Sequence, residues 1–310
     1  MFSLIKTRKI WFTISGLAFI VSLAGFLLWG LKPGIDFTGG SLLEIEFANQ
    51  RPSNTEISGA LEPLKLSDLT IQAIADKGVA LRFGTIDEET HQKILTSLKD
   101  KFKQTMSGGE GITLELKVLD EKRFYSIGPT IGQELKIKAF WAIGLATVAI
   151  ILYIAWAFRK VSRPVASWKY GTIAVLALFH DVMITVGVFV FLGEIYGLEI
   201  NATFIAAILT VFGFSVHDTI VVFDRTRENL LRHVGKDFEE IVDLSIRETV
   251  VRSINTSMTA ILALFSVLLL GGESIRDFTL ALIVGIAVGT YSSIFIASPL
   301  LVTAEKIGKK

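Results

Sequence analysis

Cysteine is absent from this 310-residue chain, histidine occurs only four times, and the charges nearly cancel. Without cysteine the protein has no disulfide, no thiolate metal site and no cysteine nucleophile. The 31 basic and 30 acidic residues leave a formal net charge of +1, which gives no reason to expect a nucleic acid as a partner.

The motifs of common enzymes are missing as well. The chain contains no Walker A loop, no Gly-x-Ser-x-Gly elbow, no His-Glu-x-x-His and no serine/lysine intramembrane dyad. ATP-driven and hydrolytic reactions therefore have no residues to support them. We expect the protein to be no enzyme and to hold no metal or other cofactor.

What the sequence does contain is long apolar runs. Apolar residues make up 51% of the chain, and six runs carry only two charged residues between them, Asp181 and Asp218. Each run meets the ~20 residues needed to cross a ~30 Å hydrocarbon core. A soluble enzyme, a secreted disulfide scaffold and a disordered protein are thus excluded, and six transmembrane helices are predicted. The runs are approximately 10–31, 139–158, 171–193, 200–223, 253–271 and 278–304.

Basic residues predict the orientation of these helices. Three of them precede the first run, which is too long for a signal peptide and is interpreted as a retained anchor. Others cluster in the loops 159–170 and 224–252 and at the C-terminus. By the positive-inside rule both termini and both loops are cytoplasmic. The basic residues are Lys6, Arg8, Lys9, Arg159, Lys160, Arg163, Lys169, Arg225, Arg227, Arg232, Lys236, Lys306, Lys309 and Lys310.

Three regions follow from this topology. Residues 1–31 form the cytoplasmic N-terminus and first transmembrane helix, 32–138 an extracytoplasmic domain, and 139–310 the remaining five helices with their cytoplasmic loops. The extracytoplasmic segment reads β-α-β-β-α-β, which predicts a ferredoxin-like α+β domain. Its expected elements are strands 41–47, 70–75, 79–83 and 112–118 and helices 53–64, opened by a Ser53/Glu56 capping box, and 87–103.

A further helix is predicted on the cytoplasmic side. Phe238, Ile241, Val242 and Ser245 recur at helical spacing, with acidic residues on the opposite side. This pattern over 236–252 predicts an interfacial helix that leads into the fifth transmembrane helix.

Asp218 is the first candidate functional residue. It lies inside the fourth run, where a charged, lipid-facing carboxylate costs roughly 2.5 to 3.5 kcal/mol. It is therefore neutral, paired or directed into the bundle. Local hydration near the interface is one interpretation, and use as a proton or ion site is the other.

Arg252 opens the fifth run and begins a polar helical stripe that continues through Asn255, Thr256 and Thr259. On one interpretation Arg252 extends to the lipid headgroups and the stripe forms hydrogen bonds between helices. On the other, Arg252 faces Asp218, because adjacent helices joined on the cytoplasmic side place both residues at similar depth.

Two His-Asp pairs, His180-Asp181 and His217-Asp218, invite a metal site. Neighbouring positions on a helix point about 100° apart, so this interpretation is weak. Asp181 is a candidate second relay or packing carboxylate, and His217 a candidate support for a proton path.

A stripe of small residues marks the last run. Residues at four-residue spacing leave one helix face bare enough for close helix contact, with this or another protein. They are Ala281, Gly285, Gly289 and Ser293.

Three segments resemble a known family. They are Gly34–Gly40, which contains Asp36, Phe37, Thr38, Gly39 and Gly40, then Gly128–Glu134, and the stretch from His217 to Asn229. Together they are similar to the SecF family of bacterial protein-export membrane subunits, and the likeness extends over essentially the whole chain.

The resemblance implies a fold and a function. The chain would be one half of a resistance-nodulation-division type transporter in the bacterial inner membrane, paired with a SecD-like subunit. It would use the proton-motive force to assist preproteins that leave the SecYEG channel, with Asp218 and Arg252 in proton transport. Two alternatives are an independent exporter of the same superfamily and a non-transporting scaffold.

Overall fold

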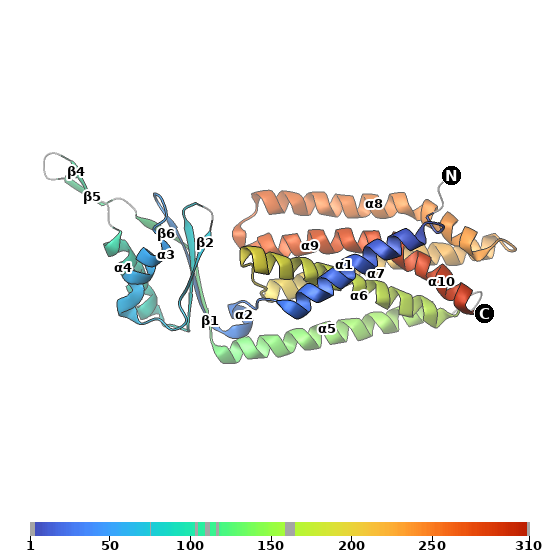
Figure 1. Ribbon diagram of the computed structural model, residues 1–310, viewed down its shortest axis with the longest axis horizontal. Coiled ribbons are helices and arrows are strands. Elements are labelled where there is room, and N and C mark those ends of the chain that lie inside the picture. Colours follow the sequence, from blue (N-terminus) through green and yellow to red (C-terminus); the bar gives the residue numbers. More distant parts are fainter. Residues whose placement is uncertain are drawn as a thin grey trace. The chain divides into compact units, whose positions relative to one another are not determined.

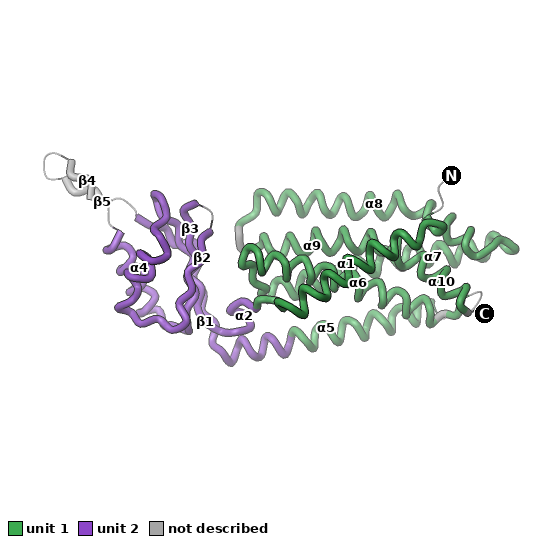
Figure 2. Tube along the Cα trace, viewed as in Figure 1, with its two compact units in different colours: residues 1–32, 139–310 green, residues 33–138 purple. Residues whose placement is uncertain are grey.

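The computed structural model describes residues 4–74, 76–102, 105–108, 112–115, 118–158 and 165–308. The chain divides into two compact units (Figure 2). Unit 1 combines Met1–Lys32 with Ala139–Lys310 and is helical, whereas unit 2, Pro33–Lys138, contains both helices and strands.

Unit 1 is a bundle of long helices, six of which are long and apolar enough to cross a membrane (Figure 1). The prediction of six transmembrane helices is therefore confirmed. The first five spans lie in α1 (Arg8–Leu28), α5 (Pro129–Ala157), α6 (Ser167–Tyr196), α7 (Ala202–Arg232) and α8 (Phe238–Leu270). The sixth combines α9 (Glu273–Ser292) with α10 (Ser298–Gly308).

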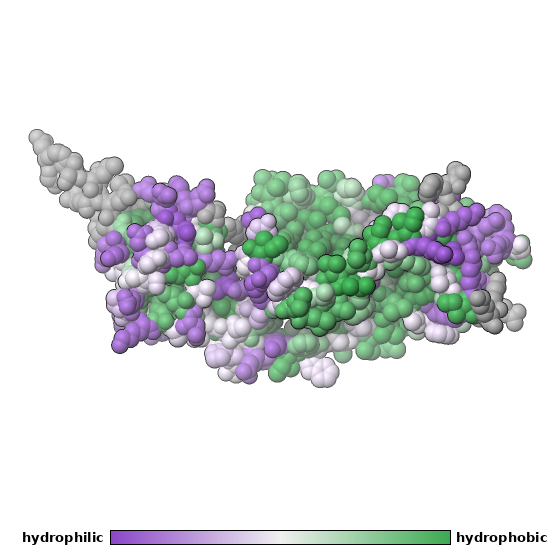
Figure 3. Space-filling view, in the orientation of Figure 1, coloured by the Kyte–Doolittle hydropathy of each residue, from purple (hydrophilic) through white to green (hydrophobic). Residues whose placement is uncertain are grey.

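The helices of unit 1 differ in how far they are buried. About half of the most apolar stretch is buried in α6 and α7 (50% each) and in the last span (56%), against 17%, 6% and 11% in α1, α5 and α8. The apolar surface of the bundle in Figure 3 is the surface that lipid would cover. Helices α6, α7 and α9 thus form the inner layer, where polar groups are shielded.

The cytoplasmic-side prediction needs two corrections. Helix α8 runs unbroken from Phe238 to Leu270, so the separate interfacial helix predicted over 236–252 is wrong. No glycine or proline interrupts this stretch, and backbone hydrogen bonding continues through it. Helix α7 likewise extends to Arg232, and the predicted loop 224–252 shrinks to a turn over 233–237.

Residues 159–164, with three of the predicted basic residues, lie outside the described residues, as do Lys309 and Lys310.

The last span contains a π-helix over Ser293–Ala297, between α9 and α10. Pro299 has no backbone N–H, so it cannot donate to the carbonyl of Phe295. Within the same segment the Ser298 hydroxyl donates to the Ser293 carbonyl over 2.8 Å. π-Helices occur frequently at functional sites.

Unit 2 has the predicted βαββαβ order. Its four-stranded antiparallel sheet is ordered β2-β3-β1-β6, with two helices packed on one face (Figure 1). The α+β fold is confirmed. The elements are α2 (Ile35–Thr38), β1 (Gly40–Phe47), α3 (Asn54–Leu61), β2 (Thr70–Ile74), β3 (Gly78–Phe83), α4 (Glu88–Lys101), β4 (Thr105–Gly108), β5 (Ile112–Glu115) and β6 (Leu119–Ile127).

One strand of the sheet was assigned wrongly from sequence. The fourth strand is β6, whereas the predicted strand 112–118 contributes only β5, paired with β4 in a separate hairpin. Strand β6 begins Leu-Asp-Glu-Lys-Arg, and its side chains are mostly half-buried or exposed. Four of these first five residues are charged, so the strand lacks the strong apolar alternation of a typical half-buried strand.

The predicted capping box of α3 is confirmed. The Ser53 hydroxyl accepts from the Glu56 backbone N–H at 3.3 Å, and Glu56 Oε2 accepts from the Ser53 backbone N–H at 2.8 Å. The helices close a core with the sheet that includes Leu43, Ile57 and Leu98, each 0% exposed.

Candidate functional site

Asp218 lies on α7, the helix that follows the N-cap residue Asn201. Asp218 is only 2% exposed. Its Oδ2 accepts a hydrogen bond from Thr290 Oγ1 of α9 at 3.1 Å and from Ser257 Oγ of α8 at 3.4 Å. Ser253, one turn before Ser257, brings a third hydroxyl near the carboxylate. Asp218 is therefore held by neutral donors from two neighbouring helices.

Of the two interpretations of Arg252, the one in which it faces Asp218 is wrong. Arg252 is exposed on α8, and within the described part of the chain its side chain forms no ion pair. Positions 252 and 253 point about 100° apart on the helix. Because Ser253 and Ser257 occupy the face toward Asp218, Arg252 is turned away from it.

The rest of the predicted stripe follows Arg252 to the outside. Asn255, Thr256 and Thr259 are all exposed, and the two threonine hydroxyls donate to carbonyls of their own helix. His217 is exposed on α7 as well. These groups form an outer polar face of α7 and α8, separate from the Asp218 cluster.

A second signal in α8 was overlooked. Ser245, Thr249, Ser253 and Ser257 repeat at four-residue spacing, and all four are buried, at 0%, 6%, 2% and 3% exposure. The regular hydroxyl repeat is visible in the sequence and defines the true inner face of the helix. The prediction was based on Arg252, which lies on the opposite, exposed face of α8.

Asp181 on α6 is buried more completely than Asp218, at 0% exposure. Its Oδ2 accepts from Ser215 Oγ of α7 at 2.6 Å and from Ser292 Oγ of α9 at 2.7 Å. Its Oδ1 lies 2.9 Å from Nδ1 of the adjacent His180. Asp181 thus links the three inner helices, and sequence reasoning identified the carboxylate without its serine partners.

The stripe of small residues on α9 lies against α7. A Cβ added to Gly285 would lie 2.2 Å from a methyl carbon of Val211, and one added to Gly289 would lie 3.1 Å from Cα of Ser215. Ala281 and Ser293 are both 0% exposed. This close approach brings the hydroxyls of α9 within reach of both carboxylates.

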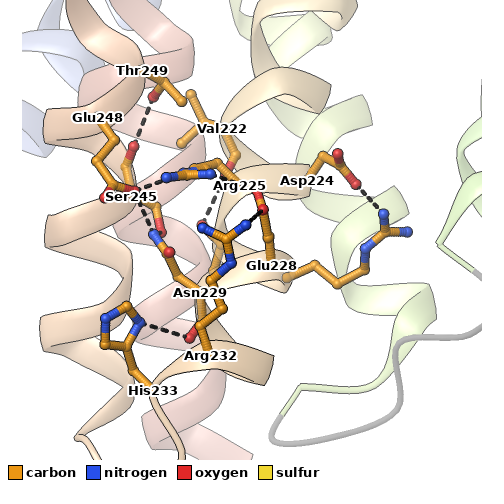
Figure 4. Close-up of polar contacts among 12 residues, drawn as sticks. Val222, Asp224, Arg225, Glu228, Asn229, Arg232, His233, Ser245, Glu248 and Thr249 are labelled. Atoms are coloured by element: carbon orange, nitrogen blue, oxygen red, sulfur yellow. Dashed lines mark hydrogen bonds and ion pairs between the residues drawn. The ribbon is translucent and has the colours of Figure 1, made fainter.

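A polar network joins α7 to α8 beyond the Asp218 cluster (Figure 4). Arg225 Nε lies 2.7 Å from Glu248 Oε2, and the Asn229 amide donates to Glu248 at 2.7 Å and to Ser245 at 3.0 Å. Asn229 and Ser245 are buried. The network fixes the rotation of α8, which keeps its hydroxyl face toward Asp218.

The two glycine-containing motifs of unit 2 meet each other. Gly39 has φ +77°, and a Cβ there would lie 2.8 Å from Cα of Pro129, the first residue of α5. A Cβ on Gly132 would lie 2.9 Å from the Gly39 nitrogen. Residues Asp36, Phe37 and Thr38 belong to the short helix α2. The motif from Asp36 to Gly40 therefore packs its backbone closely against the first turn of α5.

In the ranges that the structure covers, no group of three or more histidine, aspartate or glutamate side chains is arranged to hold a metal ion. His180 and His217 illustrate the reason, since one is buried in the bundle and the other is exposed. The chemistry available at the site is hydrogen bonding and proton exchange by carboxylates and hydroxyls.

The bundle and its buried carboxylates define a multi-pass membrane protein with a polar interior, into which an α+β unit is inserted after the first span. Family models identify it further. Residues 113–307 match the protein export membrane protein SecD/SecF C-terminal model, and residues 30–50 match the SecD/SecF GG motif.

Individual relatives agree. The chain is 42% identical over 316 residues to protein translocase subunit SecF of Thermobaculum terrenum, and 38% identical over 307 residues to that of Anaerolinea thermophila. Each comparison covers 98% of this chain and 94% of the relative. The chain therefore belongs to the SecD/SecF family, as a SecF-type subunit of the Sec protein translocation machinery.

Solved structures match the fold. SecDF from Thermus thermophilus, described as a translocon-associated membrane protein, superposes with a TM-score of 0.79 at 30% identity. SecDF in a super-membrane-facing form gives 0.66 at 31%. Both comparisons cover 99% of this chain, which spans only 39% of the SecDF chains.

Proposed function

We propose that this SecF-type subunit pairs with a SecD-like subunit and uses the proton-motive force to assist preproteins that emerge from the SecYEG channel. Protons are its transported species, and Asp218 carries them. One proton that crosses 100 mV of membrane potential contributes about 2.3 kcal/mol, enough to drive a repacking of helices.

The observation that carries the proposal is the environment of Asp218. A carboxylate inside a membrane bundle is costly and marks a functional site. Here it is 2% exposed and receives hydroxyl donors from α8 and α9. Since these donors are neutral, a proton that arrives at Asp218 displaces no cation, and the carboxyl can gain and lose it repeatedly.

The outer polar face of α7 and α8 supports a membrane-embedded partner. Arg252, Thr256 and His217 are exposed on transmembrane helices, where contact with lipid is unfavourable. A second half of similar size would cover them and supply polar partners. The SecDF chains, of which this protein matches 39%, have room for such a half, which favours a SecD-like subunit.

Orientation and location complete the proposal. Glu239 on α8 pairs with Arg8 at 3.5 Å and also with Lys306, so both ends of the described chain lie at the α7–α8 turn. The basic residues at this end favour the cytoplasm. We place the protein in the inner membrane with unit 2 outside, and assign it no covalent chemistry and no bound cofactor.

Replacement of Asp218 tests the proposal. Asp218→Asn keeps the shape and the hydroxyl contacts and removes the titration. In liposomes that hold the complete complex, we expect proton flux and proton-driven stimulation of export to be lost, while the SecD-like subunit still copurifies. Normal flux in Asp218→Asn would contradict the proposal.

The orientation is testable separately because the chain has no cysteine. Val234, 88% exposed in the α7–α8 turn, and Lys99, exposed on α4, are each replaced by cysteine. An impermeant thiol reagent added outside spheroplasts should label Lys99→Cys and spare Val234→Cys. The reverse pattern would overturn the topology.

A further inference from the structure

Asp181 is a buried titratable group that the proposed function leaves without a role. It is 0% exposed, yet it lies in the same inner layer of helices as Asp218. Carboxylates within membrane bundles are rare, and those that occur face the interior and mark ion or proton pathways.

The two carboxylates share their supporting helices. Ser215 donates to Asp181 Oδ2 over 2.6 Å and precedes Asp218 by three residues on α7. Residues at this spacing are neighbours, with Cβ atoms about 5–6 Å apart. On α9, Thr290 donates to Asp218, and two positions later Ser292 donates to Asp181. Ser215 of α7 thus bonds one carboxylate and lies one helical turn from the other, and α9 supplies one hydroxyl to each carboxylate.

Two local features single out the Asp181 end. Ser292 is followed directly by the π-helix Ser293–Ala297, an irregularity that commonly accompanies function. On the far side of Asp181, His180 Nδ1 lies 2.9 Å from Oδ1, while His180 Nε2 is buried and makes no hydrogen bond to the described residues. A ring with one nitrogen on the carboxylate and one free can pass a proton onward.

We infer that Asp181, with Ser215 and Ser292, forms a second proton-holding site that exchanges protons with Asp218 through the hydroxyls of α7 and α9. This inference rests on the proposed role of Asp218 and adds the next group in the path.

The transfer balances without any co-reactant. Protonated Asp218 gives its proton to the Ser215 oxygen after rotation of either side chain, and Ser215 releases its own hydroxyl proton to Asp181 Oδ2. Asp218 becomes a carboxylate, and Asp181 becomes a protonated carboxyl group.

A structural role for Asp181 is the alternative, since its hydrogen bonds join three helices. Asp181→Asn separates the two roles. The amide oxygen still accepts from both serines, and the amide N–H can donate to His180 Nδ1. The hydrogen bonds between the three helices therefore persist, while the proton site is lost.

The experiment measures proton flux in liposomes that contain the complete complex at a fixed membrane potential. We expect Asp181→Asn to lose about tenfold or more of the flux. The double variant Ser215→Ala/Ser292→Ala should show a comparable loss and a shifted pH profile. Copurification of the partner and the thermal unfolding midpoint of Asp181→Asn should stay unchanged.

Thr185→Val is the matched control. Thr185 is 0% exposed on α6, one turn after Asp181, and its hydroxyl donates only to the Asp181 backbone carbonyl at 2.8 Å. The substitution removes a buried hydroxyl of the same helix without touching a carboxylate, so flux should stay within about twofold of the native value.

The outcomes separate the two proposals. If Asp218→Asn abolishes flux and Asp181→Asn leaves it intact, this inference fails and the role of Asp218 stands. If Asp218→Asn leaves flux intact, the proposed function itself fails.

Infrared spectroscopy covers the case in which Asp181→Asn does not fold. In the Asp218→Asn protein, the infrared spectrum should still contain the carbonyl band of a buried, protonated carboxyl group, and the intensity of this band should change as the pH is varied. Absence of any such band would overturn the inference.

Discussion

The two units of the molecule keep their charged groups in different ways. In unit 2 the charges of the sheet are paired: Arg123 of β6 bonds Glu44 directly across on β1, and Lys122 lies 2.8 Å from Glu46. In the described part of the bundle, Asp181 and Asp218 have no lysine or arginine partner and are held mainly by hydroxyls.

This difference separates stability from function. An ion pair holds both groups in their charged forms, which suits a domain in water. Hydroxyl donors accept either form of a carboxyl, because a serine or threonine oxygen both donates and accepts. The two buried carboxylates of the bundle are therefore bound by groups that allow a change of protonation state, and close helix packing brings these groups together.

The largest expected effect comes from disturbing that packing. In Gly285→Ala the new Cβ would meet a Val211 methyl carbon at 2.2 Å. Valine is stiff in a helix and cannot turn away, so α9 must shift from α7 and withdraw Thr290 from Asp218. We expect a loss of about 1–3 kcal/mol of bundle stability, measured by unfolding in detergent.

Two further variants make that test specific. Gly285→Ala/Val211→Ala should recover most of the stability, because the obstructing methyl groups are removed. Gly213→Ala, where a Cβ meets no atom within 4 Å, is the matched control and should be nearly silent. A native unfolding midpoint for Gly285→Ala alone would contradict the packing explanation.

Next in size is the effect of the exposed arginine on transport. Since Arg252 makes no ion pair in the described chain and lies on the outer face of α8, its partner should belong to the second subunit. We expect Arg252→Ala to lower proton flux by about tenfold and to weaken association with that subunit. Arg252→Lys should retain part of both. If Arg252 only contacts headgroups, both variants will assemble and transport normally.

The sequence was sufficient for the parts of the fold that rest on length, spacing and capping. Six apolar runs predict six spans, and the Ser53/Glu56 pattern predicts the start of α3. The stripe around Gly285 and Gly289 predicts a helix contact because small side chains at four-residue spacing have one obvious use.

Sequence reasoning failed where the choice of helix face or strand depended on neighbours. Arg252 and Ser253 are adjacent, and only packing decides which of them meets Asp218. Ser215 and Ser292 lie in segments far apart in the chain, so their joint contact with Asp181 cannot be seen from spacing. Strand β6 is polar, and its pairing with β1 is what makes it a strand.

A smaller effect is expected in unit 2, where the pairing of charges can be broken. Arg123→Ala leaves Glu44, whose side chain is only 12% exposed, without its cross-strand partner. We expect about 1 kcal/mol of lost stability, and a double-mutant cycle with Glu44→Ala should recover a favourable coupling. Lys122→Ala, whose side chain is 50% exposed, is the control and should have little effect.

These measurements use residues 33–138 expressed alone. We expect this fragment to fold, because its sheet and helices close a core within it. A random-coil circular dichroism spectrum of the native fragment would contradict this expectation, and zero coupling in the cycle would show that the ion pair contributes nothing to stability.

The smallest effect concerns pH. The hydroxyl and backbone N–H of Ser53 donate to the Glu56 carboxylate and lower its pKa in the folded domain. The stabilisation is therefore complete above the unfolded pKa of about 4.3 and is lost as the pH falls through the lower folded value. In Glu56→Gln this dependence disappears, so its unfolding midpoint should fall less steeply in acid than that of the native fragment. Glu62→Gln, outside the capping box, should follow the native curve. Parallel acid profiles for the native fragment and Glu56→Gln would mean that the capping box adds no pH-dependent stability.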